Sequence, residues 1–139
     1  IIIDGHHVDY ASAKLALKTK PQGKVFLVTD AMSTIGTDQT EFSFFDRTVY
    51  LNNGRLTSTT GELAGAALDM ATAVKNTHLG IGLELDESIR MASLYPANYI
   101  NQEAIRGTLA VGKQADFVVL NDQLAVESTW IGGQAVYTK

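Results

Sequence analysis

The stretch Val25-Phe26-Leu27-Val28-Thr29-Asp30-Ala31 indicates the fold class of this chain. Its four consecutive apolar residues show no polar alternation, which is typical of a strand covered on both faces, as in a parallel sheet. Asp30 follows at the carboxyl end, where α/β sheets and barrels assemble their active sites. Asp30 is therefore a catalytic candidate. The alternative is that its side chain only caps the following turn or helix, a common use of Asp after a strand.

The residues before this strand complete a βαβ unit. Ile1 to Ile3 predict a short buried strand, and Tyr10 to Lys20 predict a helix that Pro21-Gln22-Gly23 ends. Strand, helix and strand within about thirty residues indicate parallel pairing with a right-handed crossover. Because termini are normally exposed and loosely held, a chain that opens inside a strand is expected to be the carboxyl-terminal part of a longer protein.

Two other regions predict antiparallel strands. The first has a hairpin turn at Asn52-Asn53-Gly54, and the second turns at Gly132-Gly133. Their strands, rich in β-branched and aromatic side chains, are expected at residues 42–44, 48–51, 55–57, 115–120, 128–131 and 134–137.

Two helices are expected between these regions. The first runs over about residues 65–78, because apolar residues recur at helical spacing and Gly80 supplies a stop. The second begins at Asp86 as its N-cap and ends near Tyr95, because the next residue is a proline.

Composition excludes several functions. At 139 residues, with 45% hydrophobic and 19% charged side chains, the chain has the balance of a globular protein. A net charge of −4 without a run of Lys or Arg argues against nucleic acid and anionic membranes as partners. The absence of cysteine excludes disulfides, thiolate metal sites and a Cys nucleophile. No apolar run approaches the roughly 18 residues of a membrane span, and a cytoplasmic location is expected.

Three motifs, Asp4-Gly5-His6-His7-Val8-Asp9, Val28-Thr29-Asp30-Ala31 and Leu63-Ala64-Gly65, follow one another in the order and spacing of one known family. They resemble the carboxyl-terminal half of the N-acetylglucosamine-6-phosphate deacetylases. Residues 92–97 and 107–120 resemble the carboxyl-terminal signature of the wider amidohydrolase superfamily. The resemblance covers essentially the whole chain.

The resemblance implies an α/β fold, the carboxyl-terminal part of a (β/α)8 TIM-type barrel with part of a small flanking β-sandwich. Residues 1–40 would contain the last two barrel strands, and residues 61–106 the barrel helices. Residues 41–60 would form a β-hairpin of the sandwich or of an adjoining extension. Residues 107–139 would supply the carboxyl-terminal strands of the sandwich.

The resemblance also implies metal-dependent hydrolysis of the acetamide of N-acetylglucosamine 6-phosphate to glucosamine 6-phosphate and acetate. Asp30 matches the catalytic aspartate, which takes a proton from metal-bound water and returns it to the leaving amine. His7 matches a substrate-binding histidine that can help to stabilise the developing oxyanion. Leu63, Ala64 and Gly65 match a substrate-contacting segment, where small residues at a helix start let the backbone approach a sugar.

The implied cofactor is a divalent metal ion, zinc or similar. Its ligands in the family, a glutamate and histidines from earlier strands, are expected upstream of Ile1, so no metal ligand is expected in this chain. The implied partner is an amino-sugar phosphate, bound in a homo-oligomer whose active site is completed by a neighbouring subunit. The isolated chain is expected to be inactive.

Other polar residues near these motifs have structural interpretations. His6 is expected to be structural or solvated, because neighbours on an extended chain face opposite ways. Asp4 and Asp9 are expected to hold the histidine loop by turn hydrogen bonds. His78 is expected to lie at a helix end, where an imidazole can contact the last carbonyls.

Two other functions are compatible with parts of the sequence. Another amidohydrolase, such as a dihydroorotase or a deaminase, would share Asp30 and the carboxyl-terminal signature but not the His7 and Leu63–Gly65 motifs. A non-enzymatic β module would account for the antiparallel strands but not for the βαβ start.

Overall fold

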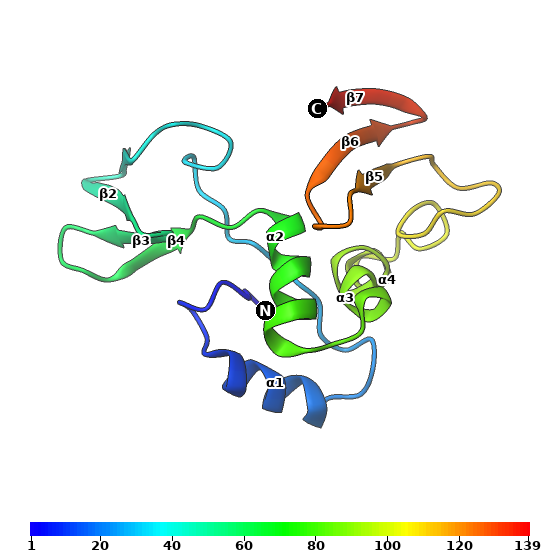
Figure 1. Ribbon diagram of the computed structural model, residues 1–139, viewed down its shortest axis with the longest axis horizontal. Coiled ribbons are helices and arrows are strands. Elements are labelled where there is room, and N and C mark those ends of the chain that lie inside the picture. The colour runs from blue at the N-terminus through cyan, green and yellow to red at the C-terminus, as the bar shows by residue number, and fades with distance from the viewer.

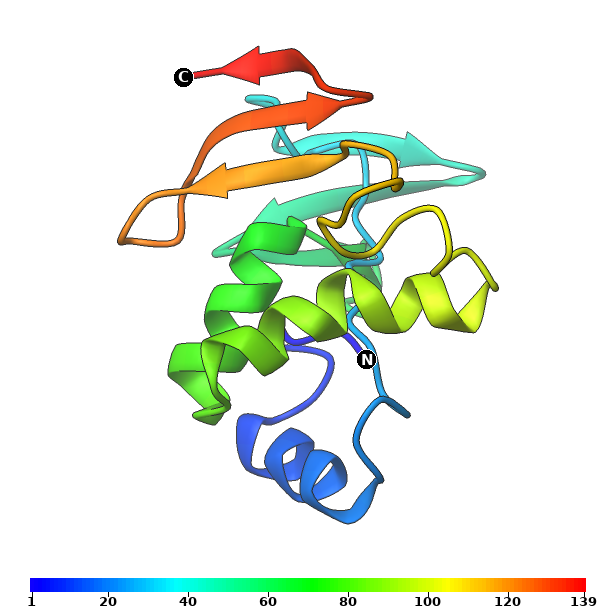
Figure 2. The same ribbon diagram turned by 90° about the vertical axis from the view of Figure 1, so that its right-hand side faces the viewer.

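The computed structural model describes all 139 residues and shows a group of helices flanked by two separate antiparallel sheets (Figures 1 and 2). The helices are α1 (Tyr10–Thr19), α2 (Met70–Lys75), the π-helical η1 (Asn76–Ile81), α3 (Leu85–Ala92) and α4 (Leu94–Tyr99). One sheet has the order β1 (Glu41–Phe44), β2 (Arg47–Asn52), β3 (Arg55–Ser58) and β4 (Leu63–Ala66). The other has the order β5 (Phe117–Leu120), β6 (Val126–Ile131) and β7 (Gln134–Thr138). None of the helices has the length and apolar character that a membrane crossing requires.

The predicted parallel pair exists as hydrogen bonds but not as two regular strands. The terminal nitrogen of Ile1 donates to the Phe26 carbonyl at 2.8 Å, and the Val28 N–H donates to the Ile1 carbonyl at 3.0 Å, which is the parallel pattern. The prediction of coverage on both faces is wrong, because Leu27 is buried but Val28 is 40% exposed. The Leu27 N–H donates to the Met91 carbonyl of α3 at 2.9 Å, so a helix end takes the place of a further strand.

The first predicted helix is confirmed as α1. Asp9 is its N-cap and accepts the Ala11 N–H at 2.9 Å. The helix ends at Thr19, two residues before Pro21. One face is anchored through the fully buried Ala13.

The helix expected over residues 65–78 begins later than predicted. Leu63–Ala66 form β4, and α2 begins at Met70 after its N-cap Asp69, whose carboxylate accepts the Thr72 N–H at 2.8 Å. The helical spacing was misleading because its first apolar positions belong to a strand and to the connection after it. The capping aspartate was the signal that marked the true start.

The end of this helical segment also differs from the prediction. The chain continues from α2 into η1, which is ended by Gly82 with a left-handed φ of 83°. Gly80 lies inside η1 and has a packing role instead, because a Cβ there would lie 2.6 Å from Cε2 of Tyr10. Because Gly80 has no side chain, the ring of Tyr10, the first residue of α1, can lie against η1.

The second predicted helix is two helices in the structure. α3 has Glu84 as its N-cap residue, with Asp86 and Glu87 in its first turn. The chain breaks at Ser93, and α4 follows with Pro96 in its first turn. Pro96 therefore lies inside a helix rather than beyond one, because a first-turn residue needs no backbone N–H partner.

Both predicted hairpin turns are confirmed. Asn53 and Gly54 have φ values of 50° and 77° between the paired residues Asn52 and Arg55, as a type I′ turn requires. Gly132 and Gly133, with φ values of 58° and 78°, join β6 to β7. The first hairpin is extended by β4, which the sequence analysis did not predict, into the four-stranded sheet.

The hydrophobic core lies between the helices and the two extended segments rather than within a sheet. Its ten buried residues are Ile3, Ala13, Leu27, Ala66, Leu68, Ala73, Val74, Ile81, Met91 and Tyr95. Only Ala66 of these belongs to a strand. Ile3 directly precedes Asp4, and Leu27 lies three residues before Asp30. The backbone before each of these two aspartates is therefore held in place by a core residue.

Candidate active site

Asp30 ends its extended segment in a strained backbone conformation. Its φ of 53° is left-handed, a region that costs a non-glycine residue roughly 1 kcal/mol, less for Asp than for most. The carboxylate is exposed and takes part in no hydrogen bond or ion pair within the chain. The capping alternative requires this side chain to accept a backbone N–H. Since it accepts none, the structure gives Asp30 no capping role.

The backbone on the carboxyl side of Asp30 is held by β4. The Ala66 N–H donates to the Asp30 carbonyl at 2.8 Å, and the Met32 N–H donates to the Ala66 carbonyl at 3.1 Å. These two bonds make a parallel bridge between Ala31 and Ala66. The end of β4 therefore lies beside Asp30.

The segment that pairs with residues 25–30 on their other side begins at Ile1 and leads into the histidine loop, residues 4–9, which Asp4 organises. One Asp4 carboxylate oxygen accepts the N–H groups of His6 and His7, both at 2.9 Å, and the other lies 2.7 Å from Nδ1 of His7. The Asp4 side chain is only 8% exposed. The predicted turn role of Asp4 is confirmed. Its hydrogen bond to the His7 ring was not predicted from the sequence.

The charge of Asp4 fixes how His7 presents its ring. Partial burial raises the pKa of the Asp4 carboxyl, but hydrogen bonds from the His7 and His6 backbones and from the His7 ring outweigh it, so the net pKa is lowered. An ionised Asp4 can only accept, so Nδ1 of His7 carries a proton. Nε2 is then an acceptor in neutral His7 and a donor in the imidazolium form. His7 is partly exposed, with 21% of its side chain accessible.

Residues Leu63–Gly65 belong to strand β4. The sequence analysis had expected them at the start of a helix, so that expectation is wrong. Gly65 has a φ of 84°, and a Cβ there would lie 3.2 Å from the Asp30 carbonyl oxygen. Its closest neighbour is the Met32 side chain, with Cγ only 2.3 Å from that Cβ position. The backbone of this segment thus comes within contact distance of Asp30 because Gly65 has no side chain.

The structure therefore brings three predicted segments to one edge. The hydrogen bonds of Ile1 with Phe26 and Val28 have the parallel pattern, so the chain runs in the same direction from Ile1 toward the histidine loop as from Phe26 toward Asp30. The histidine loop leaves from one segment, Asp30 ends the next, and Gly65 of β4 follows on its other side.

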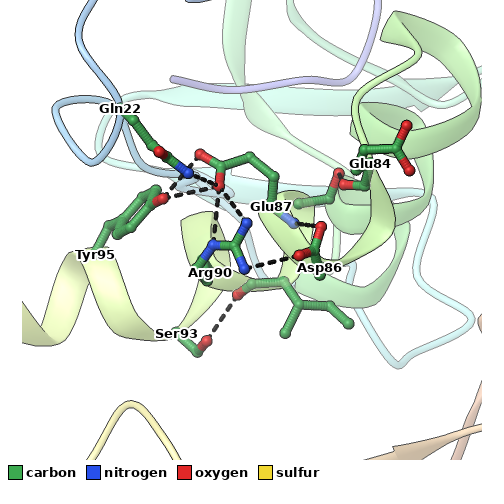
Figure 3. Close-up of polar contacts among 9 residues, drawn as sticks. Gln22, Glu84, Asp86, Glu87, Arg90, Ser93 and Tyr95 are labelled. Carbon is green, nitrogen blue, oxygen red and sulfur yellow. Dashed lines mark hydrogen bonds and ion pairs between the residues drawn. The ribbon is translucent and has the colours of Figure 1, made fainter.

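A second polar cluster centres on Glu87 of α3 (Figure 3). Its carboxylate accepts from Gln22 at 2.8 Å, from the Tyr95 hydroxyl at 2.8 and 2.9 Å, and from Nε of Arg90 at 2.9 Å. Partial burial raises the pKa of Glu87, but these hydrogen bonds outweigh it and the net pKa is lowered. Arg90 also contacts Asp86 at 2.9 Å, and its pKa is raised by both acids. Gln22 precedes the segment that ends at Asp30, so this cluster lies toward the opposite end.

Residues 7–136 match the amidohydrolase family. The chain belongs to this family. N-acetylgalactosamine-6-phosphate deacetylase from Shewanella sp. is 44% identical over 137 residues, which are 99% of this chain and 34% of that protein. Human N-acetylglucosamine-6-phosphate deacetylase is 33% identical over 138 residues, again 99% of this chain and 34% of the relative. The chain thus spans about a third of the length of these relatives.

A solved structure shows the same fold as this amidohydrolase chain. The crystal structure of N-acetylglucosamine-6-phosphate deacetylase from Pasteurella multocida superposes with a TM-score of 0.95 at 37% identity. The match covers 100% of this chain and 36% of the other. The resemblance inferred from the motifs is confirmed, and so is the mixed α/β class.

The amidohydrolase family is generally metal-dependent, but the side chains of this chain do not form a metal centre. No group of three or more His, Cys, Asp or Glu residues is arranged to hold an ion. His6 is exposed, His7 is bound to Asp4, and Nδ1 of His78 lies 2.7 Å from the Leu83 carbonyl oxygen. The three histidines therefore have separate surroundings, and none of them belongs to a cluster that could hold a metal ion.

The site of this amidohydrolase contains two features that the sequence analysis missed. The spacing of Asp4 and His7, three residues apart at the end of a strand-like segment, was a signal for their pairing. The approach of Met32 to Gly65 had no local signal, because the two residues are brought together only by the bridge between Ala31 and Ala66.

Proposed function

We propose that the full-length protein hydrolyses the acetamide of an N-acetylhexosamine 6-phosphate, releasing acetate and the free hexosamine 6-phosphate. The observation that carries the proposal is the Asp30 carboxylate, which is exposed, unbonded and held on strained backbone between the histidine loop and Gly65. The three proteins compared above all carry a deacetylase name for this substrate class. These names favour a deacetylase over a dihydroorotase, a deaminase or a non-enzymatic module.

In this proposal Asp30 moves the proton of the reaction. Its carboxylate takes a proton from the attacking water while the water oxygen bonds to the acetyl carbonyl carbon. It then gives that proton to the amide nitrogen as the C–N bond breaks, so that acetate and an amine leave. A carboxylate without protein partners is free to do both, because no hydrogen bond has to be broken first.

His7 has a binding and stabilising role in the same proposal. Asp4 holds Nδ1 and leaves Nε2 for the ligand, and in the imidazolium form Nε2 donates to an oxygen that gains negative charge. Leu63, Ala64 and Gly65 form the backbone wall on the other side of Asp30, against which the sugar would lie.

Two epimeric substrates have separate support. The three motifs resemble the deacetylases of N-acetylglucosamine 6-phosphate, and the Pasteurella multocida structure carries that name. The 44% identical Shewanella relative is named for N-acetylgalactosamine 6-phosphate, which differs only in the configuration at C4. N-acetylglucosamine 6-phosphate is our first candidate, and its C4 epimer is the second.

The proposal extends to the parts of the protein outside this chain. The segments described here would form the last two strands and the helices of a (β/α)8 barrel with part of a small β-sandwich. The divalent metal, zinc or similar, would be held by residues outside this chain, and a neighbouring subunit of a homo-oligomer would complete the site. The chain alone would be inactive, and the location of the whole protein would be cytoplasmic.

The test is an assay of the purified full-length protein with both epimers. Acetate and free amine should appear in equal amounts, and the kcat/KM ratio of the two epimers identifies the preferred substrate. The unphosphorylated sugars serve as controls, because the proposal requires the 6-phosphate. Absence of turnover with both phosphorylated sugars by the metal-loaded protein would contradict the proposed function.

A further inference from the structure

The backbone of Asp30 needs support from its neighbours, because the residue is left-handed and its side chain is not tied to any protein group. The φ of 53° is a conformation that a chain leaves unless its surroundings determine it. The bridge to Ala66 supplies two bonds, from the Ala66 N–H to the Asp30 carbonyl and from the Met32 N–H to the Ala66 carbonyl. Both bonds lie on the carboxyl side of Asp30, so they orient its carbonyl group without acting on its side chain or on the peptide group before it.

Packing of Met32 against Gly65 supplies the missing restraint. A Cβ on Gly65 would lie 2.3 Å from Met32 Cγ, 2.8 Å from Met32 Sδ and 3.2 Å from the Asp30 carbonyl oxygen. Real Cβ atoms essentially never lie within 3.0 Å of such neighbours. The conflict involves Cγ and Sδ of Met32, so an alanine at residue 65 would require the Met32 side chain to leave this position. Met32 therefore occupies space that exists only because residue 65 is glycine.

We propose that Gly65 and Met32 are positioning residues for Asp30, in that Met32 packed over the Cα of Gly65 holds the left-handed backbone from which the Asp30 carboxylate projects. The assignment rests on the proposed function of Asp30 as the proton carrier. It gives Gly65 a role beyond contact with the sugar, and it includes a residue, Met32, that lies outside the three motifs.

The test is a set of variants of the full-length protein, Gly65→Ala, Met32→Ala and the double variant. Gly65→Ala should lower kcat by roughly 10- to 100-fold with KM changed less than about threefold, because a displaced catalytic group affects chemistry more than binding. Met32→Ala removes the same packing contact, so it should also lower kcat, and the double variant should lose no more kcat than the more damaging single variant. A purely sugar-binding Gly65 would instead raise KM, and Met32→Ala would leave kcat unchanged.

Gly61→Ala is the matched control. Gly61 lies between β3 and β4, has a φ of 88°, and a Cβ there would meet nothing within 4 Å. It carries the same left-handed backbone penalty as Gly65 without the steric conflict. Gly61→Ala should lower the melting temperature through this backbone penalty and leave kcat unchanged. A loss of kcat in Gly61→Ala as large as in Gly65→Ala would overturn the inference.

Crystal structures of the wild-type and Gly65→Ala proteins separate this inference from the proposed function. The inference expects Asp30 to leave its left-handed φ in Gly65→Ala and also in Met32→Ala. An unchanged Asp30 φ in Gly65→Ala overturns the inference, whatever the activity. A wild-type protein without turnover contradicts the proposed function alone, because the backbone comparison still decides whether Met32 and Gly65 hold Asp30.

Discussion

The carboxylates of Asp30 and Glu87 lie in opposite surroundings. Glu87 accepts hydrogen bonds from Gln22, Tyr95 and Arg90, which lower its pKa and hold it as an anion (Figure 3). Asp30 has no partner, is exposed and stands on left-handed backbone. A fully bonded carboxylate stabilises the elements that it joins, whereas an unbonded one on a strained backbone is available to a ligand. The contrast separates a structural acid, Glu87, from Asp30, the acid that we propose for the chemistry.

Asp30→Asn should have the largest effect of any single change. Asn keeps the shape and polarity of the side chain but cannot take up and return a proton, so kcat of the full-length protein should fall by about 10² to 10⁴-fold. Because the carboxylate has no partner in the fold, the melting temperature and the metal content should stay near wild type. Near-normal turnover would show that Asp30 has no part in the mechanism, and the contrast with Glu87 would then have no catalytic meaning.

His7→Asn should have the next largest effect. Loss of a donor to the developing oxyanion typically lowers the rate by about 100-fold, and kcat/KM should fall by that order. Metal content, measured by elemental analysis, should not change, because His7 is bound to Asp4 and belongs to no ligand cluster. If the variant loses its metal, His7 is a ligand and its proposed role is wrong.

Glu87→Gln should change stability and leave turnover alone. The carboxylate is 16% exposed and loses charge-assisted bonds to Arg90, so the free energy of unfolding of the full-length protein should fall by about 2 kcal/mol. Asp86→Asn is the matched control. Asp86 is 70% exposed, so its bond to Arg90 is screened by solvent and should stabilise the protein less than the bonds of Glu87 do. A large loss of kcat in Glu87→Gln would mean that the two regions are coupled.

The stability difference caused by Glu87→Gln should depend on pH in one direction. Because the pKa of Glu87 is lowered in the folded state, its stabilisation is complete above the ordinary pKa of 4.5 and is lost as the pH falls through the folded-state value. Wild type and variant should therefore differ at pH 7 and converge in acid. Thermal or denaturant unfolding across pH 7 to 3 measures this convergence, and a constant difference would assign the stabilisation to packing.

Asp4→Asn should lower activity less than Asp30→Asn or His7→Asn does, because Asp4 acts only through the ring of His7. Asn can still accept the two backbone N–H bonds of the turn, but it removes the charge that faces Nδ1 of His7. We expect kcat/KM to fall by about tenfold, with a changed pH profile, as a misoriented or wrong-tautomer imidazole would give. Unchanged kinetics would mean that Asp4 only stabilises the turn, through its hydrogen bonds to the backbone of His6 and His7.

Features that depend on neighbours in the sequence were predictable. The Asn53-Gly54 and Gly132-Gly133 turns, the start of α1 after Asp9 and the alternating strands all follow from local backbone preferences, and the structure shows each of them. The motifs identified the family for the same reason, since a match to known motifs needs only order and spacing.

Features that depend on distant residues were not predictable. Leu63–Ala66 form a strand because β3 and the bridge at Ala31 offer partners, which outweigh helical spacing. Glu87 finds Gln22 across 65 residues of sequence. By itself the sequence determined the turns, the α/β class, the family and the candidate residues, because local sterics and motif order encode them. Only the tertiary structure decided that Asp30 is left-handed and unbonded beside Gly65 while Glu87 is fully bonded, because long-range contacts set both environments.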